Sequence, residues 1–203
     1  MKLYTTSPRI ESKYITNNIG LNKFLLLFKK NGFVRSFPNR IVNSLYYDNL
    51  QCSSIKDNLA GITPRNKFRL RWYGDKKSGI KGYQFEKKIK LNLTGFKKIY
   101  YFANDFNIFS IDYSMEGLQN RTKIYDQSFL PLNYKPQLLC CYERQYFENA
   151  YSVRLTIDSK IKFWSINNNI RYSLSKPFIE SSYIILEIKY EPSNKDTLFP
   201  LFR

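Results

Sequence analysis

The stretch RNKFRLRWYG (65–74) alternates cationic and apolar residues. Successive side chains of a β-strand point to opposite faces, so this stretch predicts a strand with one cationic and one apolar face. The cations are Lys67, Arg69 and Arg71, and the apolar residues are Phe68, Leu70 and Trp72. A strand of this kind is typical of a sheet that presents charge on one side and packs a core on the other.

The same alternation recurs outward along the chain. It covers residues 9–13, 86–90, 154–160 and 184–189, and Arg144 lies between the tyrosines of YERQY (142–146). In an isolated strand, alternate charges usually mark the solvent side. Here SYIILEIKY (182–190) is too apolar for an edge strand, although it carries Glu187 and Lys189. A closed barrel whose polar faces converge on a highly charged ligand accounts for both features.

The other patterns predict the elements that join these strands. We expect a strand over 9–16, a helix over 20–31, a turn and a strand over 37–49, helical turns within 53–64, and an antiparallel pair formed by 65–73 and 83–91. A glycine-containing link over 75–82, helical cover over 103–137, and strands over 138–148, 152–164, 170–175 and 183–191 complete the prediction. The fold class is therefore α+β: a mainly antiparallel closed β-barrel, or tunnel, with flanking helices.

Composition restricts the function. The 203 residues include 33 Lys or Arg and 16 Asp or Glu, which gives a net charge of +17. This charge predicts an anionic partner, with polyphosphate, nucleotide, RNA and an anionic membrane as open alternatives. The chain has no histidine, which excludes Ser-His-Asp, Cys-His and His-metal chemistry in their usual forms. Three cysteines support neither a disulfide framework nor a zinc site, and with no apolar membrane span we expect a cytoplasmic protein.

Five segments resemble, in this order, the VTC domain of vacuolar transporter chaperone polyphosphate polymerases, part of the CYTH or triphosphate tunnel metalloenzyme superfamily. They are RIVNSLYYDN (40–49), KDNLAGITPRNKFRLRWYG (56–74), YERQYF (142–147), VRLTID (153–158) and ILEIKY (185–190). The resemblance implies an antiparallel barrel in which cationic side chains hold a triphosphate and a glutamate holds a divalent metal. It also implies that residues 1–203 form one tunnel domain.

The resemblance implies roles for individual residues by their position. Five cations are expected to stabilise the transferring phosphoryl group: Arg69, Arg71, Lys88, Arg144 and Arg154. Lys13 and Tyr142 are implied as substrate-binding residues, and the alternation adds Lys67, Lys90 and Lys189. Glu187 is implied as the ligand of Mg²⁺ or Mn²⁺, with Glu11 and Glu86 as further candidates.

The chemistry of these residue types suits a triphosphate. Each guanidinium can hold two phosphate oxygens at once, so a few arginines and lysines can replace the hydration shell of the anion. Enclosed cations repel one another unless an anion or acidic neighbours compensate them, and Glu11, Glu86 and Asp158 are placed to do so. Lysines outside the alternating positions, including Lys97 and Lys98, are assigned to a solvated surface.

The predicted function is that of an ATP-dependent polyphosphate polymerase. Such a metal-dependent phosphotransferase moves the γ-phosphoryl group of ATP to a growing polyphosphate, and an ionised phosphate needs little help from a general base. A tunnel triphosphatase or tripolyphosphatase and a non-catalytic polyphosphate- or nucleotide-binding module are the alternatives. The expected partners are ATP and polyphosphate, without a specific nucleic acid, whereas peripheral membrane association and the oligomeric state stay open.

Three features depart from the family pattern. Arg9 stands in the first strand where many superfamily members have a glutamate, which disfavours the hydrolytic alternative. Asn58 stands where eukaryotic polymerases tend to have another arginine, for which Lys56 or Arg65 would compensate. The sequence ends before the segment that carries a late lysine in relatives, so we expect a shortened tunnel domain that is either weakened in activity or inactive.

Overall fold

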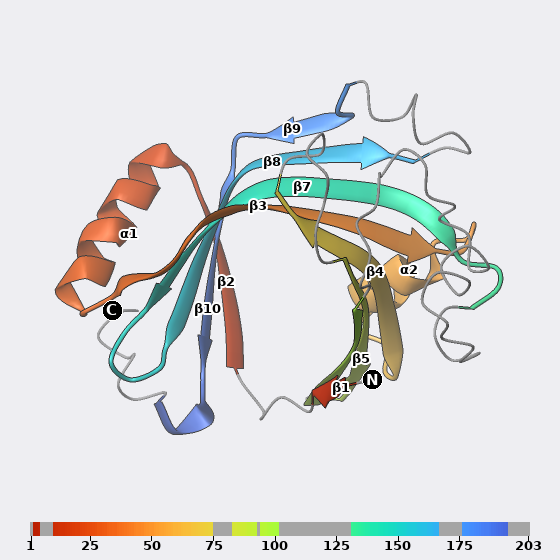
Figure 1. Cartoon of the computed structure of the whole chain (residues 1–203), viewed down its shortest axis with the longest axis horizontal. Helices are drawn as coiled ribbons and strands as arrows, with labels where there is room; N and C mark the ends of the chain where they lie inside the picture. The colour runs from red at the N-terminus through yellow and green to blue at the C-terminus, as the bar shows by residue number, and fades with distance from the viewer. Residues whose placement is uncertain are drawn as a thin grey trace. The chain divides into compact units, whose positions relative to one another are not determined.

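The computed structural model describes residues 2–4, 10–74, 83–92, 94–101, 131–166 and 176–194. Its elements are ten strands, two α-helices and one short 3-10 helix (Figure 1). They are β1 (Lys2–Tyr4), β2 (Ile10–Thr16), α1 (Asn18–Lys30), β3 (Val34–Asp48), α2 (Ser53–Leu59), β4 (Arg65–Tyr73), β5 (Gln84–Leu91), β6 (Thr94–Tyr101), β7 (Lys135–Glu148), β8 (Arg154–Ser165), β9 (Ile179–Ser181), β10 (Ile184–Tyr190) and η1 (Pro192–Asn194).

The described strands form one sheet with the order β1-β6-β5-β4-β3-β7-β8-β10-β2, and β9 pairs with β8. The pairs of β1 with β6, β6 with β5, β5 with β4, β4 with β3, β8 with β10, and β10 with β2 are antiparallel. The mainly antiparallel sheet is therefore confirmed. The closed barrel is wrong for the described strands, because the order is open: β1 is three residues long and pairs with β6, not with β2.

The chain divides into two compact units. Unit 1 comprises Met1–Thr6, Val42–Cys141 and Phe163–Ile179, and unit 2 comprises Ser7–Ile41, Tyr142–Lys162 and Glu180–Arg203. Strands β3, β7, β8 and β9 each contribute residues to both units. The expectation of a single tunnel domain stays a prediction.

Unit 1 has a core made by one face of β3, β4 and β5. Phe68, Leu70 and Trp72 alternate with the cations of β4, and each is at most 2 % exposed. Phe85 packs against this face, with its ring centroid 5.7 Å from that of Tyr47 and 6.5 Å from that of Phe68. Because side chains alternate along a strand, burial of these apolar residues places the neighbouring cations on the opposite face.

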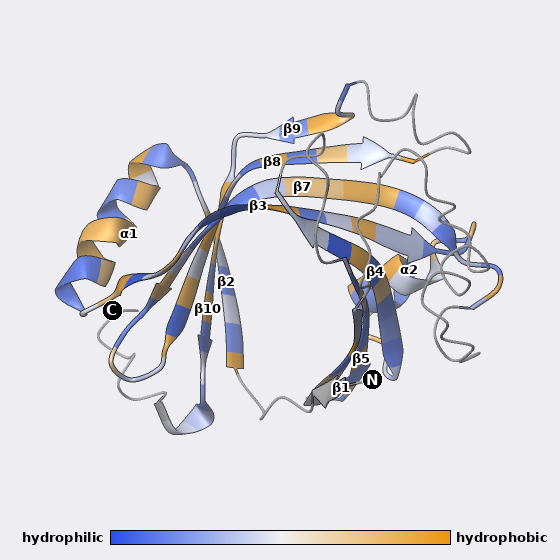
Figure 2. Ribbon diagram, in the orientation of Figure 1, coloured by the Kyte–Doolittle hydropathy of each residue, from blue (hydrophilic) through white to orange (hydrophobic). Residues whose placement is uncertain are grey.

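Unit 2 packs α1 against the apolar face of β2, β8 and β10. The helix begins where the side chain of Asn17 accepts a hydrogen bond of 2.9 Å from the Gly20 amide, which satisfies one of the unpaired donors of the first turn. Phe28 packs with Leu155 and Leu186 in the unit 2 core. Along β10 the alternation of hydrophilic and hydrophobic residues is visible as bands (Figure 2).

Some predicted elements differ from the structure. Residues 37–38 were expected to form a turn, but they lie within the 15-residue strand β3. The pairing of β3 with β4 covers Val42–Tyr47, so Pro38 lies outside that ladder. The missing N–H of Pro38 therefore removes no hydrogen bond from this pair of strands. The predicted helical cover is wrong at its end, because β7 begins at Lys135. The predictions over 75–82, 103–130 and 170–175 fall outside the described residues. No described helix combines the length and the apolar character needed to span a membrane.

Candidate functional site

One face of β4, β5 and β6 in unit 1 concentrates positive charge. Residues directly opposite each other on antiparallel strands share a face, so the pairs Lys67–Lys88, Arg69–Glu86 and Arg65–Lys90 place these side chains together. Lys97 joins them because it lies opposite Lys88. We call this set the cationic face: Arg65, Lys67, Arg69, Arg71, Lys88, Lys90 and Lys97, with Glu86 as its described carboxylate.

Three lysines of the cationic face form a row across neighbouring strands. Lys67 on β4 lies opposite Lys88 on β5, which lies opposite Lys97 on β6. A polyanion bound across the three strands can contact all three ammonium groups.

Glu86 is the carboxylate around which the cationic face is organised. It is 2 % exposed, accepts a hydrogen bond from Nε of Arg69, and forms ion pairs with Arg69 and with Lys97, whose Nζ lies 2.7 Å from Oε1. Burial acts to raise the pKa of Glu86, but the charges of Arg69, Arg71 and Lys97 outweigh burial and lower this pKa from 4.5 to about 2. Burial lowers the pKa of Lys97, and attraction to Glu86 opposes that shift.

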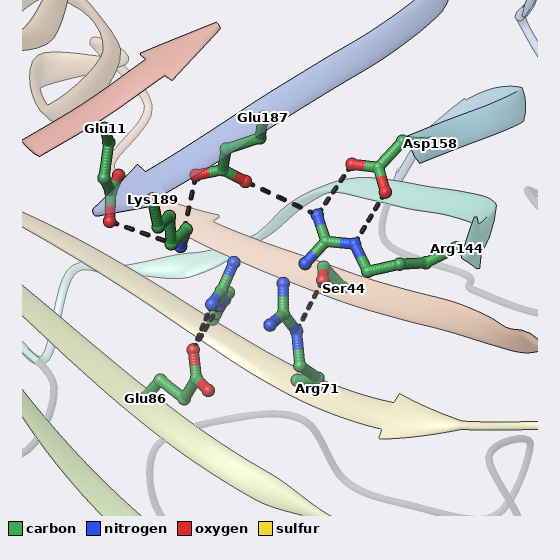
Figure 3. A network of polar contacts seen from close by, with 9 residues as sticks. Glu11, Ser44, Arg71, Glu86, Arg144, Asp158, Glu187 and Lys189 are labelled. Carbon is green, nitrogen blue, oxygen red and sulfur yellow. Dashed lines mark hydrogen bonds and ion pairs between the residues drawn. The ribbon is translucent and has the colours of Figure 1, made fainter. Parts of the chain in front are cut away.

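Arg71 is held from the neighbouring strand. The residue is 8 % exposed, and its Nε donates a hydrogen bond of 3.3 Å to Oγ of Ser44, which lies directly opposite it on β3 (Figure 3). This contact restrains the guanidinium within unit 1. A restrained guanidinium loses less conformational freedom when it binds a phosphate.

Unit 2 contains a second charged group, which we call the mixed-charge cluster: Glu11, Arg144, Asp158, Glu187 and Lys189. Arg144 binds Asp158 through two hydrogen bonds of 2.6 Å, and its Nη2 lies 3.8 Å from Glu187 (Figure 3). Nζ of Lys189 lies 3.2 Å from Glu11 and 3.1 Å from Glu187. Positive and negative side chains therefore alternate in this cluster, unlike in the cationic face.

The surroundings of Arg144 hold it strongly ionised. Burial acts to lower its pKa, but the hydrogen bonds to Asp158 and the charges of Asp158 and Glu187 raise the pKa above its usual value. The ring of Tyr142 adds a cation–π contact, with its centroid 5.1 Å from Cζ of Arg144. Arg144 is thus a fixed cation at any physiological pH.

Each predicted site residue can be placed in one of the two units. Lys67, Arg69, Arg71, Lys88, Lys90 and Glu86 lie together on the cationic face, and Tyr142, Arg144, Glu187, Lys189 and Glu11 lie in or against the mixed-charge cluster. Lys13 is exposed and lies opposite Glu187 on β2. Arg154 lies opposite Lys189, but its side chain is 54 % exposed and pairs with Glu148 at 3.3 Å. Their roles in binding stay predictions, and Arg9 lies outside the described residues.

Sequence reasoning missed Lys97. It was expected on a solvated surface, yet it is half-buried and paired with Glu86, because β6 pairs with β5. The Lys97–Lys98 doublet and Gly95 obscure the alternation in TGFKKIYY. A usable sequence signal was present, because asparagine is favoured in tight turns and tolerates a positive φ, and Asn92 adopts a φ of 53° in the short link between β5 and β6.

Only some of the described carboxylates are suited to bind a divalent metal ion. No three Cys, Asp or Glu side chains in the described ranges come close enough together to enclose an ion. Glu86 is not suited to bind a metal ion, because both of its carboxylate oxygens are already paired, one with Arg69 and the other with Lys97. Glu11 and Glu187 share the ammonium of Lys189, and two carboxylates are the donors that suit a Mg²⁺ or Mn²⁺ ion whose other ligands are water and substrate phosphates.

The fold and the charges define an antiparallel β-sheet protein with a surface suited to a polyanion. The chain belongs to the VTC domain family, whose model matches residues 8–201, and the resemblance found in the sequence is thereby confirmed. No curated protein is significantly similar to it in sequence.

Two solved structures match most of this chain. The PH1819 protein from Pyrococcus horikoshii OT3 is 13% identical with a TM-score of 0.50, over 96% of this chain and 85% of that chain. HpAC1 from Hippeastrum, an adenylyl cyclase candidate described with a dominant triphosphatase activity, is 13% identical with a TM-score of 0.49, over 96% of this chain and 85% of that chain. At this identity the likeness to the PH1819 protein concerns the fold alone.

Proposed function

We propose that the chain is an ATP-dependent polyphosphate polymerase that transfers the γ-phosphoryl group of ATP to a growing polyphosphate. The observation that carries this proposal is the cationic face of unit 1, where seven cations (Arg65, Lys67, Arg69, Arg71, Lys88, Lys90 and Lys97) share one face with one described carboxylate, Glu86. Membership of the VTC domain family supports a condensed phosphate as the anion.

The cationic face supplies two kinds of contact. Arg69 and Arg71 present planar guanidinium groups that can hold two oxygens of one phosphate. The row Lys67–Lys88–Lys97 crosses three strands, which lie about 4.8 Å apart, so it spans roughly 10 Å. A row of this length can contact several consecutive phosphates of a chain without selecting its ends.

The residues of the mixed-charge cluster are proposed, from the sequence prediction, to bind condensed phosphate as well. Arg144, fixed by Asp158, would stabilise the equatorial oxygens of the transferring group, and Lys13, Arg154 and Tyr142 would bind the chain around it. Glu187 and Glu11 would hold Mg²⁺ or Mn²⁺, which supplies charge neutralisation and orientation of the phosphates when bound.

The proposed transfer needs no general base. A terminal oxygen of the polyphosphate forms a bond to the γ-phosphorus, the bond from the γ-phosphorus to the β–γ bridging oxygen breaks, and ADP leaves with that electron pair. The attacking oxygen is already ionised, so no proton has to be removed. The arginines stabilise charge on the transferring group and hold the two chains in line, which is consistent with a chain that has no histidine.

Incubation with ATP and Mn²⁺, followed by gel electrophoresis of the products, tests the proposal. We expect one molecule of ADP for each phosphoryl group added to the polymer. We also expect polymer synthesis to require Arg71. Release of orthophosphate without polymer would contradict the polymerase and identify a hydrolase. Binding of tripolyphosphate without turnover would leave a non-catalytic polyphosphate-binding module.

Hydrolysis is a second candidate because of one observation in unit 2. Oγ1 of Thr156 is buried without a described hydrogen-bond partner, and Thr156 lies directly opposite Glu187. A buried hydroxyl beside a carboxylate can hold an ordered water, which is the nucleophile that a triphosphatase needs. Thr156→Val should abolish hydrolysis and leave polymer synthesis intact if both reactions occur.

Lys97 and Lys98 provide a matched test of which face binds phosphate. They are neighbours on β6, so their side chains point to opposite faces, and only Lys97 shares a face with Lys88. We expect Lys97→Ala to weaken tripolyphosphate binding about tenfold, as the loss of one charge-assisted contact would, and to reduce the salt dependence of binding. Lys98→Ala should change the Kd less than twofold in the same titration. Equal effects of the two substitutions would indicate nonspecific attraction by net charge.

A further inference from the structure

Lys189 occupies a position that a divalent cation would be expected to take. Its Nζ lies between a carboxylate oxygen of Glu11 on β2, at 3.2 Å, and one of Glu187 on β10, at 3.1 Å (Figure 3). All three residues lie in unit 2. The ammonium group is therefore a stand-in for a metal between two carboxylates.

The ammonium and a metal ion cannot share these carboxylates. Oxygen ligands lie about 2.1 Å from Mg²⁺, so each carboxylate would have to draw in by about 1 Å while Lys189 leaves. Arg144, 3.8 Å from Glu187, adds repulsion against an incoming dication. In the absence of substrate, a metal ion thus has to displace one cation and approach another.

The side chain of Lys189 is more exposed than that of Glu187 and can change its position more easily. Its side chain is 32% exposed and that of Glu11 is 35% exposed, whereas that of Glu187 is 8% exposed. A long, partly exposed lysine can swing its ammonium towards a neighbouring anion at little cost. A phosphate chain beside the cluster would offer such an anion.

We propose that Lys189 is a built-in competitor for the divalent metal, so that this site takes up the metal together with a phosphate chain and binds it weakly alone. The anion draws the Lys189 ammonium away from Glu11 and Glu187, and the freed carboxylates then accept the ion. Metal and condensed phosphate are coupled ligands, each of which raises the affinity for the other. The ligand class is a divalent cation complexed with triphosphate or polyphosphate.

Titration of Mn²⁺ into the nucleotide-free protein, followed by the electron paramagnetic resonance signal of the free ion, tests this proposal. Lys189→Met and Lys189→Gln should each bind Mn²⁺ at least about tenfold more tightly than the wild type, and Lys189→Arg should bind as weakly as the wild type. The control is Lys162→Met, which removes a lysine paired with Glu180 at 3.1 Å in the same unit and should change nothing.

The expected gain in Mn²⁺ affinity must depend on the carboxylates of Glu11 and Glu187. Addition of Glu11→Gln to Lys189→Met should return Mn²⁺ binding to the wild-type level. Unchanged Mn²⁺ affinity in folded Lys189→Met and Lys189→Gln, checked by circular dichroism, or a gain that survives Glu11→Gln, would overturn the proposal. The inference deepens the metal part of the proposed function, but the titration contains no nucleotide, so its failure would leave the phosphoryl-transfer proposal to be judged separately by the product assay.

Discussion

Replacement of Arg71 by methionine is expected to lower kcat for polymer synthesis by roughly 100-fold or more. Removal of one preorganised donor to a charged transition state commonly has an effect of this size. Arg71 is 8 % exposed and oriented by Ser44, so its guanidinium can stabilise the transferring group without first being ordered. The measurement is steady-state synthesis from ATP and Mn²⁺ by wild-type and Arg71→Met proteins.

A measurement of the stability of Arg71→Met distinguishes a loss of catalysis from misfolding. Arg71 lies near enough to Lys97 that its charge contributes to lowering the pKa of that lysine. Methionine removes repulsion towards Lys97 together with attraction to Glu86, and it keeps the apolar part of the side chain. Because the two charge effects oppose each other, the melting temperature should not fall by more than a few degrees. Ser44→Ala should give a smaller loss of kcat, because the arginine remains but is less well oriented. Wild-type kcat in a folded Arg71→Met protein would contradict the assignment.

Replacement of Glu86 by glutamine is expected to destabilise unit 1 by about 3 kcal/mol at neutral pH and low salt, because it leaves two partly buried cations without their shared carboxylate. Glu86 is 2 % exposed and pairs with both Arg69 and Lys97. Urea unfolding measures the change. Glu180→Gln, which removes the exposed partner of Lys162, is the control and should cost less than about 1 kcal/mol.

Tripolyphosphate should rescue the Glu86 variant. If the anion and the carboxylate compensate the same cations, a saturating amount should raise the melting temperature of Glu86→Gln by more than that of the wild type. An equal shift in both proteins would mean that tripolyphosphate binds away from the cationic face.

The contribution of Glu86 should also depend on pH in one direction. Its pKa is about 2 in the folded protein, below its ordinary value of 4.5. The carboxylate therefore stabilises the fold fully above pH 4.5, and this contribution is lost as the pH falls towards 2. The difference in unfolding free energy between the wild type and Glu86→Gln should shrink over that interval. A constant difference from pH 7 to pH 2 would contradict the ion pairing.

Much of the fold could be predicted because alternation is a local property. The predicted strand over 65–73 coincides with β4, and its pairing with β5 was predicted from the link between them. The strands β6 and β9 and the length of β3 were not predictable in this way. Gly95 and Pro38 weaken the local pattern in β6 and β3, and β9 is only three residues long. Barrel closure depends on the pairing of strands that are distant in the sequence.

The site was predictable in its residue types and less so in its contacts. Arg69, Arg71 and Glu86 were named from alternation, and the structure places them together. Sequence reasoning named Glu86 and Glu11 as acidic neighbours that compensate enclosed cations, but it could not say which cations they bind. The 17-residue separation between Arg69 and Glu86 is closed only by strand pairing. Lys189 was assigned to substrate, and in the structure it binds Glu11. Such pairings follow from register, which a one-residue slip would change.

A crystal structure of the protein with tripolyphosphate would locate the anion directly. We predict that its oxygens lie within hydrogen-bonding distance of Arg69 and Arg71 and along the row Lys67–Lys88–Lys97. Tripolyphosphate bound instead on the opposite face of the same strands, where Lys87 and Lys98 lie, would contradict the proposed site.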